Sequence, residues 1–117
     1  MLRFLYPYLT TRLLTTAKDL MKDPITVSNS ASIADALRKI VDKDISRIIV
    51  NHDDEPVGII TERDIGLFLL TEQTDRKIDE IPISEIMNKL VAVDQSMSIQ
   101  DCAEIMVNRD IGSLGVN

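Results

Sequence analysis

Residues 17–51 read AKDLMKDPITVSNSASIADALRKIVDKDISRIIVN, and residues 83–117 read ISEIMNKLVAVDQSMSIQDCAEIMVNRDIGSLGVN. The two stretches align at a constant offset of 66 without a gap, with 11 identities in 35 positions. Other positions exchange similar residues, such as Ile40 for Met106 and Ile48 for Leu114. A repeat of this length is one supersecondary unit that cannot easily bury its apolar face alone. The duplication therefore predicts two similar halves.

The composition limits the kinds of protein to consider. A length of 117 residues suggests one domain, here built from two halves, and 44% of the residues are hydrophobic. No stretch approaches the roughly 20 apolar residues that a membrane-spanning helix needs. The net charge of −6 argues against a general nucleic-acid surface, because phosphate neutralisation needs clustered Lys and Arg. The single cysteine excludes an internal disulfide and indicates a reducing cytoplasm.

The first 16 residues differ from the rest, with two Arg, no acidic residue and many apolar residues, among them Phe4, Leu5 and Leu13. Pro7 interrupts the apolar run, so a signal peptide is not expected. Two interpretations remain, and we adopt the first: an arm or short helix that packs on the body or on a partner chain. The second is a weak membrane-surface anchor, which would need more cations.

Both copies follow the same pattern of expected elements. Ser32 and Asp35 resemble a capping box in front of a helix to about Lys43. The apolar faces of this helix and its counterpart are predicted to be Ile33, Ala36, Leu37, Ile40 and Val41, and Ile99, Cys102, Ala103, Met106 and Val107. The other elements of the first copy are a strand at 25–27, a hairpin of 47–51 and 57–60 with its turn at 52–56, and a helix from Thr61 to about Gln73 with Ile65, Phe68 and Leu69 inward.

This order, β-α-β-β-α, places the chain in the α/β or α+β class, with helices on one side of each small sheet. The second copy lacks the final strand and helix, so its sheet is expected to have an open edge. The N-terminal arm, or a segment swapped from a partner, could cover that edge. We divide the chain into an arm at 1–16, a first repeat at 17–75, an exposed polar linker at 76–82 and an incomplete second repeat at 83–117.

The strongest chemical motif is Gly58-Ile59-Ile60-Thr61-Glu62-Arg63-Asp64. Gly58 lacks a side chain, so a planar ligand could approach the backbone there. Thr61 stands at the start of a helix, where its hydroxyl and free N–H groups favour phosphate. Asp64 lies on the same first turn and can accept from a pair of hydroxyls. These features predict a ribonucleotide site, and the alternative is a well-capped helix with Thr61 as N-cap and Asp64 at N3.

The hairpin followed by Gly-Ile-Ile-Thr-x-x-Asp, with Asp-Leu-Met-x-x-Pro-Ile-Thr-Val about 40 residues upstream, resembles the CBS domain, the regulatory domain of cystathionine β-synthase. The resemblance covers Ala17 to Asn117. It implies a pair of repeats packed about a pseudo-twofold axis. It also implies clefts that bind AMP, ADP, ATP or S-adenosylmethionine, and dimerisation into a flat disc.

The resemblance also assigns roles to single residues. Thr61 and Asp64 match the ribose and phosphate contacts. Gly58 and Arg63, in the same motif, are also expected to bind the ligand. Thr26 and Val27 match the segment that flanks the adenine, and Ile45, Ser46 and Arg47 match a stretch that lines the cleft. Arg47 is the best cation for phosphate, because its guanidinium can pair with phosphate oxygens.

The second copy departs from the motif. Ser46-Arg47 becomes Gly112-Ser113, and its counterpart of Thr61-x-x-Asp64 would lie beyond Asn117. One strong nucleotide site per chain is therefore predicted. Arg109 could reach the first cleft from across the pair, or it could be a solvated residue at the end of a helix.

The remaining candidates are weak. Cys102 replaces Ala36 on an apolar helix face, so we interpret it as a small core residue. His52 lies in a turn among acidic residues and is interpreted as a surface residue rather than a metal ligand. No grouping suited to catalysis is evident, so the chain is not expected to be an enzyme.

The predicted function is a regulatory module that senses an adenosine compound and signals through a conformational or oligomeric change, as a homodimer with an unidentified regulated protein. No cofactor, metal or membrane span is expected. The alternative is a ligand-independent dimerisation or interaction module, or a fragment of a longer protein.

Overall fold

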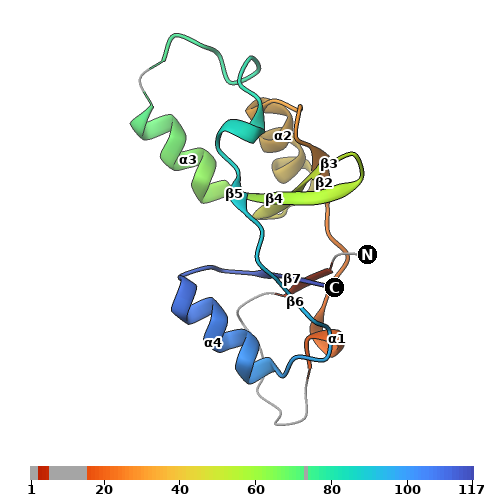
Figure 1. Cartoon of the computed structure of the whole chain (residues 1–117). Coiled ribbons are helices and arrows are strands. Elements are labelled where there is room, and N and C mark those ends of the chain that lie inside the picture. Colours follow the sequence, from red (N-terminus) through yellow and green to blue (C-terminus); the bar gives the residue numbers. More distant parts are fainter. Residues whose placement is uncertain (1–2, 6–15, 73) are drawn as a thin grey trace. The chain divides into compact units, whose positions relative to one another are not determined.

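The computed structural model describes residues 3–5, 16–72 and 74–117. The chain forms two compact units, which are described separately here (Figure 1). The continuous unit comprises Ile25–Lys89, and the split unit combines Met1–Pro24 with Leu90–Asn117. Each unit contains a small sheet and helices, so the predicted mixed α/β class is confirmed.

The continuous unit contains a four-stranded sheet in the order β2-β3-β4-β5. Strands β2 and β3 are parallel, whereas β4 is antiparallel to both β3 and β5. Asp53 and Asp54, both with positive φ, form the two-residue turn between β3 and β4, as the turn chemistry predicts. In chain order the elements are β2 (Thr26–Ser28), α2 (Ile33–Lys43), β3 (Arg47–His52), β4 (Glu55–Thr61), α3 (Glu62–Thr71), the 3-10 helix η1 (Ile83–Glu85) and β5 (Asn88–Lys89).

The core of the continuous unit is aliphatic. Helices α2 and α3 both contribute to one cluster with the inward residues of β3 and β4, which confirms that the helices cover one side of the sheet. The fully buried members are Ile33, Ala36, Ile40, Ile48, Val50, Ile60, Ile65, Ile81 and Ile83.

The split unit contains a three-stranded sheet in the order β1-β7-β6, in which β6 and β7 are parallel and β1 is antiparallel to β7. Its elements are β1 (Arg3–Leu5), α1 (Ala17–Leu20), β6 (Ala92–Val93), α4 (Ile99–Arg109) and β7 (Leu114–Val116). Its core cluster is formed by Ala17, Val93, Ile99, Cys102, Met106, Leu114 and Val116.

Helices α2 and α4 coincide residue for residue at the offset of 66. Ser32 and Ser98 cap them by accepting hydrogen bonds from the backbone N–H groups of Asp35 and Asp101, at 3.0 and 3.1 Å. Both helices end on an aspartate in the left-handed conformation, with φ of 52° and 51°. The duplication in sequence is thus a duplication of local structure.

Strand β1 holds the place in the split unit that β4 holds in the continuous unit. Phe4 lies opposite Gly115, and at the offset of 66 this pair corresponds to Ile59 opposite Ile49. The expected open edge of β7 is therefore paired within the chain, and the arm rather than a partner's segment supplies the strand. Residues 1–2 and 6–15 of the predicted arm lie outside the described residues.

The segment that leads into each repeat packs on the other repeat. Ala17 N–H donates to Met97 O at 3.0 Å in the split unit, and Ile83 N–H donates to Ala31 O at 2.8 Å in the continuous unit. These are the same bond at the offset of 66. The compact units therefore do not coincide with the sequence repeats, because the repeats exchange their leading segments.

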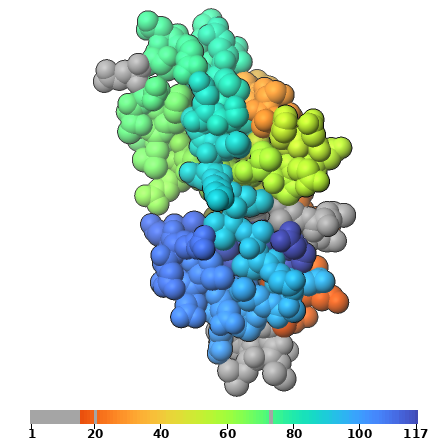
Figure 2. Space-filling model, viewed as in Figure 1, coloured from red at the N-terminus to blue at the C-terminus, as the bar shows by residue number. Residues whose placement is uncertain are grey.

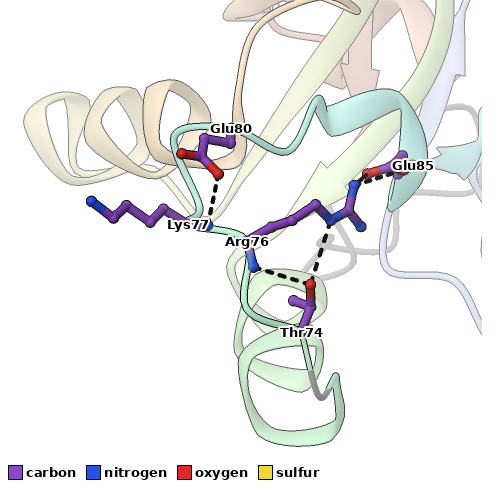
Figure 3. Close-up of polar contacts among 5 residues, drawn as sticks. All are labelled: Thr74, Arg76, Lys77, Glu80 and Glu85. Carbon is purple, nitrogen blue, oxygen red and sulfur yellow. Dashed lines mark hydrogen bonds and ion pairs between the residues drawn. The ribbon is translucent and has the colours of Figure 1, made fainter.

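The segment after α3 folds back over the continuous unit instead of forming an exposed linker. The Arg76 guanidinium donates to both carboxylate oxygens of Glu85, at 3.0 and 3.2 Å (Figure 3). Figure 2 shows the segment running across the surface of this unit beside α3. Ile81 is fully buried and Ile78 packs on the same core, whereas the charged residues of the segment are exposed, so the expectation of an exposed connector was wrong in part. Its spaced isoleucines cover an apolar face that charge content alone does not reveal.

The predicted apolar faces of the helices were too wide. Val41 and Val107 are 66% and 79% exposed, although their spacing assigns them to the core. Each lies eight residues after the first buried position of its helix, a rotation of roughly 80° that places it at the margin of the buried stripe. Leu69 of α3 is 51% exposed, also contrary to the prediction.

Candidate functional site at the start of helix α3

Four of the predicted site residues meet at one end of the sheet in the continuous unit. Arg47, the first residue of β3, lies opposite Thr61, the last residue of β4. Ser46 precedes Arg47, and its carbonyl accepts a 2.8 Å hydrogen bond from the backbone N–H of Glu62. Asp64 follows on the first turn of α3. The hairpin register thus places Arg47 and the Thr61 hydroxyl at the same end of the sheet, and the first turn of α3 adds the Asp64 carboxylate.

Thr61 and Asp64 form a capping box. The Asp64 backbone N–H donates to Thr61 Oγ1 at 3.1 Å, and the Thr61 backbone N–H donates to Asp64 Oδ2 at 2.8 Å. The geometry of a well-capped helix is therefore present. It does not consume the Thr61 hydroxyl proton, because Oγ1 acts as an acceptor in the cap and can still donate to a ligand.

The expectation of several free N–H groups at this helix start was wrong in part. Of the three first-turn amides, Glu62 N–H is donated to Ser46 and Asp64 N–H to Thr61. The tight hairpin brings the Ser46 carbonyl onto the helix end, an approach that the motif alone does not show. A phosphate group would therefore rely on side chains more than on the helix terminus.

Asn88 also belongs to this group, although it is not among the site residues predicted from the sequence. Its Nδ2 amide donates to Asp64 Oδ2 at 3.0 Å. Asn88 lies in β5 opposite Ile59 of β4, so the sheet register positions it beside the helix start. It belongs to the second repeat in sequence but to the continuous unit in space, which is why motif reading within one repeat does not find it.

The two arginines of the site differ in their surroundings. Arg47 is partly buried, and its Nε donates a hydrogen bond to Ser46 Oγ at 3.4 Å. Arg63 is exposed on the first turn of α3. Arg47 is thus held at the site, whereas Arg63 borders it from solvent.

Other predicted residues lie elsewhere or have a structural explanation. Val27 and Ile45 are partly buried and pack against the core of the continuous unit. Gly58 faces Met87: a Cβ at this position would lie 2.7 Å from Met87 Sδ, so the glycine makes room for that side chain. Arg109 is exposed at the end of α4 in the split unit.

Thr26 borders an open pocket of about 700 Å³ that also includes Val27 but not Thr61 or Asp64. The Thr26 carbonyl accepts a 2.6 Å hydrogen bond from Lys39 Nζ, which uses one of the three N–H donors of that ammonium group. The pocket is therefore distinct from the group around Asp64.

The secondary candidates have structural roles. Cys102 is fully buried in the core of the split unit, as predicted, and burial raises the pKa of its thiol. His52 is largely exposed, with Nε2 lying 3.4 Å from Asp53 Oδ2.

Within residues 3–5, 16–72 and 74–117 we find no group of three or more potential metal ligands. The same part of the chain contains no helix long and apolar enough to cross a membrane.

Comparison with known proteins agrees with this architecture. A sequence profile of the CBS domain family matches residues 17–69 and 83–116. The chain belongs to the CBS domain family, and its two matches form a tandem pair.

A curated relative, an uncharacterised protein of Methanopyrus kandleri, is 31% identical over 97 residues. The match covers 81% of this chain and 48% of that protein, so the chain spans about half the length of this relative.

Two solved structures illustrate the fold. The CBS domain pair of protein MJ0100, in complex with 5′-methylthioadenosine and S-adenosylmethionine, is 25% identical with a TM-score of 0.75, over 88% of this chain and 80% of that one. A CBS domain protein of Pyrobaculum aerophilum complexed with AMP is 21% identical with a TM-score of 0.72, over 83% of this chain and 74% of that one.

Proposed function

We propose that this CBS pair is a regulatory module, not an enzyme, and that it binds an adenosine compound at the start of helix α3. The observation that carries the proposal is the convergence of Thr61, Asp64 and Arg47 through the β3–β4 register. A ribose diol would donate to the Asp64 carboxylate, the Thr61 hydroxyl would donate to a ligand oxygen, and Arg47 would pair with a negatively charged group. The complex of the MJ0100 pair with two adenosine compounds supports this ligand class.

One such site per chain is proposed. In the split unit, β1 takes the position of β4, and the residues that follow it in the sequence are Tyr6-Pro7-Tyr8-Leu9. These contain neither the threonine nor the aspartate of the Thr61-x-x-Asp64 motif. Ser113, the counterpart of Arg47, is almost fully buried and has no charge to offer a phosphate.

Occupancy of the site would act by shifting a conformational equilibrium. A ligand changes such an equilibrium only as far as it binds one state more tightly than the other. The site includes the junction of β4 and α3 and, through Asn88, the strand that leads out of the continuous unit. Ligand binding there would favour one conformation of the segment that joins the two units. A regulated partner protein would respond to that conformation.

Isothermal titration calorimetry with AMP, ADP, ATP and S-adenosylmethionine tests the proposal. We expect at least one to bind more tightly than millimolar, and the proposal fails if none does. The double variant Thr61→Ala/Asp64→Ala should weaken that binding at least about tenfold, since it removes hydrogen bonds to a charged group. Ser32→Ala/Asp35→Ala is the matched control, because it removes the capping box of α2 in the same unit.

A second function, association with another copy of the chain, is favoured by a separate observation. Val41 and Val107 occupy equivalent positions in α2 and α4 and are both largely exposed. Apolar residues that stay exposed at the same place in both repeats suit a symmetric homodimer. Sedimentation of Val41→Glu/Val107→Glu should show a monomer if these faces associate, and an unchanged mass would exclude these faces as the contact.

The cytoplasmic location stays a prediction from the single cysteine.

A further inference from the structure

We infer that Asn88 is the positioning residue that sets the ribose selectivity of the site, by holding the Asp64 carboxylate in one orientation. The inference rests on the proposed function and goes beyond it, because it assigns a specificity role to a residue outside the Gly58–Asp64 motif. It depends on two donors that meet at one carboxylate oxygen of Asp64 in α3: the Thr61 backbone N–H at the end of β4 and the Asn88 side-chain amide in β5.

The two oxygens of Asp64 are in different environments. Oδ2 accepts two hydrogen bonds, from the Thr61 backbone N–H at 2.8 Å and from Asn88 Nδ2 at 3.0 Å. Oδ1 accepts none from the part of the chain that the structure describes. An ionised carboxylate can only accept, so the Asn88 group that faces it must be the NH₂. The two donors fix Oδ2 and leave Oδ1 as the oxygen presented to a ligand.

The capping bond alone does not fix the plane of the carboxylate. A single bond to Oδ2 restrains rotation about the Cβ–Cγ bond of Asp64 only loosely, because this torsion is broad. A second donor from a different direction restricts it. Asn88 comes from the neighbouring strand, opposite Ile59, whereas the Thr61 N–H comes from the end of β4. The pair of donors therefore pre-orients Oδ1 before the ligand arrives.

A pre-oriented acceptor favours ligands with hydroxyl groups. Both hydroxyls of a ribose can donate to a carboxylate whose orientation is set, whereas a 2′-deoxyribose has lost one of these donors. The Asn88 amide oxygen lies on the same side chain and adds an acceptor next to the carboxylate. Asn88 thus contributes to the discrimination between ribose and deoxyribose without contributing to adenine or phosphate binding.

The test is the ratio of dissociation constants for 2′-deoxy-AMP and AMP, measured by calorimetry on the full chain. In Asn88→Ala we expect AMP binding to weaken about 5- to 10-fold and 2′-deoxy-AMP binding less than about 2-fold, so that the ratio collapses. Lys89→Ala, an exposed neighbour in the same short strand, is the matched control and should leave the ratio unchanged. A purely structural role of Asn88 would weaken both ligands equally, and that result would overturn the inference.

Asn88→Asp provides a second readout in a nearly isosteric variant. At pH about 8 two carboxylates would face each other, and AMP binding relative to the native chain should fall further than in Asn88→Ala. As the pH falls to about 5, one of two adjacent carboxyl groups takes up a proton and can donate to the other, so the relative affinity should recover. A relative affinity that stays constant between these pH values would contradict the inference.

The two proposals fail in distinguishable ways. If the native chain binds neither AMP nor 2′-deoxy-AMP, and none of the other adenosine compounds, both the function and the role of Asn88 are rejected. If the native chain binds AMP in preference to 2′-deoxy-AMP and Asn88→Ala keeps that preference, only the role of Asn88 is rejected.

Discussion

Arg3 of β1 lies opposite Val116 of β7 in an antiparallel pair. At the offset of 66 this pair corresponds to Gly58 opposite Val50 in the continuous unit. The strand from the arm is thus in register with a strand of the second repeat. The split unit gains an antiparallel neighbour for β7 from a segment 110 or so positions away in the sequence, and the edge of β7 does not remain open.

Substitution of Leu5 by proline should open this edge. Gly115 N–H donates to Val91 O, toward β6, so Leu114 and Val116 direct their backbone groups toward β1. Leu5 lies opposite Leu114, and a proline there removes one N–H from the ladder, at a cost of at least about 1 kcal/mol. We expect faster hydrogen exchange at the amides of Leu114 and Val116. Leu5→Ala keeps the N–H and is the control, and equal exchange in the two variants would count against the pairing.

Substitution of Gly58 by alanine should destabilise the continuous unit by about 1–2 kcal/mol. The new Cβ would lie 2.7 Å from Met87 Sδ and 3.0 Å from Asn88 O, so a side chain and a backbone must both move. Gly66→Ala is the contrasting control, because no described atom other than its chain neighbours and the adjacent helix backbone lies within 4 Å of its Cβ, and α3 gains helix propensity of roughly 0.5–1 kcal/mol. Urea unfolding should give opposite signs for the two variants, and a neutral Gly58→Ala would refute the packing explanation.

The helix cap of α2 should contribute to the pH dependence of stability. Hydrogen bonds from the Ser32 backbone, then from its side chain, lower the pKa of the Asp35 carboxyl from its usual 3.8. A carboxyl whose pKa is lower in the folded state stabilises the fold above about pH 4, and this contribution disappears as the pH falls through the folded pKa. Asp35→Asn should therefore lower the urea midpoint at pH 6 but not at pH 2.

Asp101→Asn is the matched comparison for that experiment. Asp101 is the counterpart of Asp35 in α4, and its backbone N–H donates to Ser98 in the same way. We find no reciprocal bond from Ser98 N–H to the Asp101 carboxylate among the described residues. The midpoint of Asp101→Asn should thus follow the native chain at both pH values. A loss at pH 6 as large as that of Asp35→Asn would show that the reciprocal bond is not the cause.

Cys102 should be unreactive in the folded protein. Its side chain is fully buried, and burial raises the pKa of the thiol, so the reactive thiolate is scarce at neutral pH. Alkylation by iodoacetamide should follow global or local unfolding and accelerate in urea. Cys102→Ala introduces the residue found at the equivalent position of the first repeat, Ala36, and should cost about 1 kcal/mol. Rapid alkylation in buffer would place the thiol nearer the surface.

Local features were predicted accurately because they depend on neighbouring residues. The helix behind Ser32 and its copy behind Ser98 start at the predicted caps, and both end on an aspartate in the left-handed conformation. The hairpin was also predicted, although its turn is confined to Asp53 and Asp54 instead of spanning 52–56. The width of the buried face of each helix was overestimated, since Val41 and Val107 were assigned to it and are exposed. A periodic pattern does not show how far the elements that cover a helix extend.

The candidate site was predicted in part. Thr61 and Asp64 were identified because they are three residues apart, and the hairpin register adds Ser46 and Arg47 to the same end of the sheet. The contact of Asn88 with Asp64 joins residues 24 positions apart in sequence that belong to different repeats. Spacing within a motif carries no information about such a contact, so only the structure shows it.

The sequence by itself determined the duplication, which is visible as an alignment of two segments. It also determined the caps of α2 and α4 and the Thr61-x-x-Asp64 motif, because the hydrogen bonds in these features join residues only three positions apart. Only the tertiary structure decided which segments share a core. Ala17 packs with the second repeat and Ile83 with the first, and β1 pairs with β7. These contacts form because an apolar face must be covered and a strand edge must be paired. Segments of similar pattern that are distant in the sequence can meet both needs, so the sequence pattern does not show which segment does.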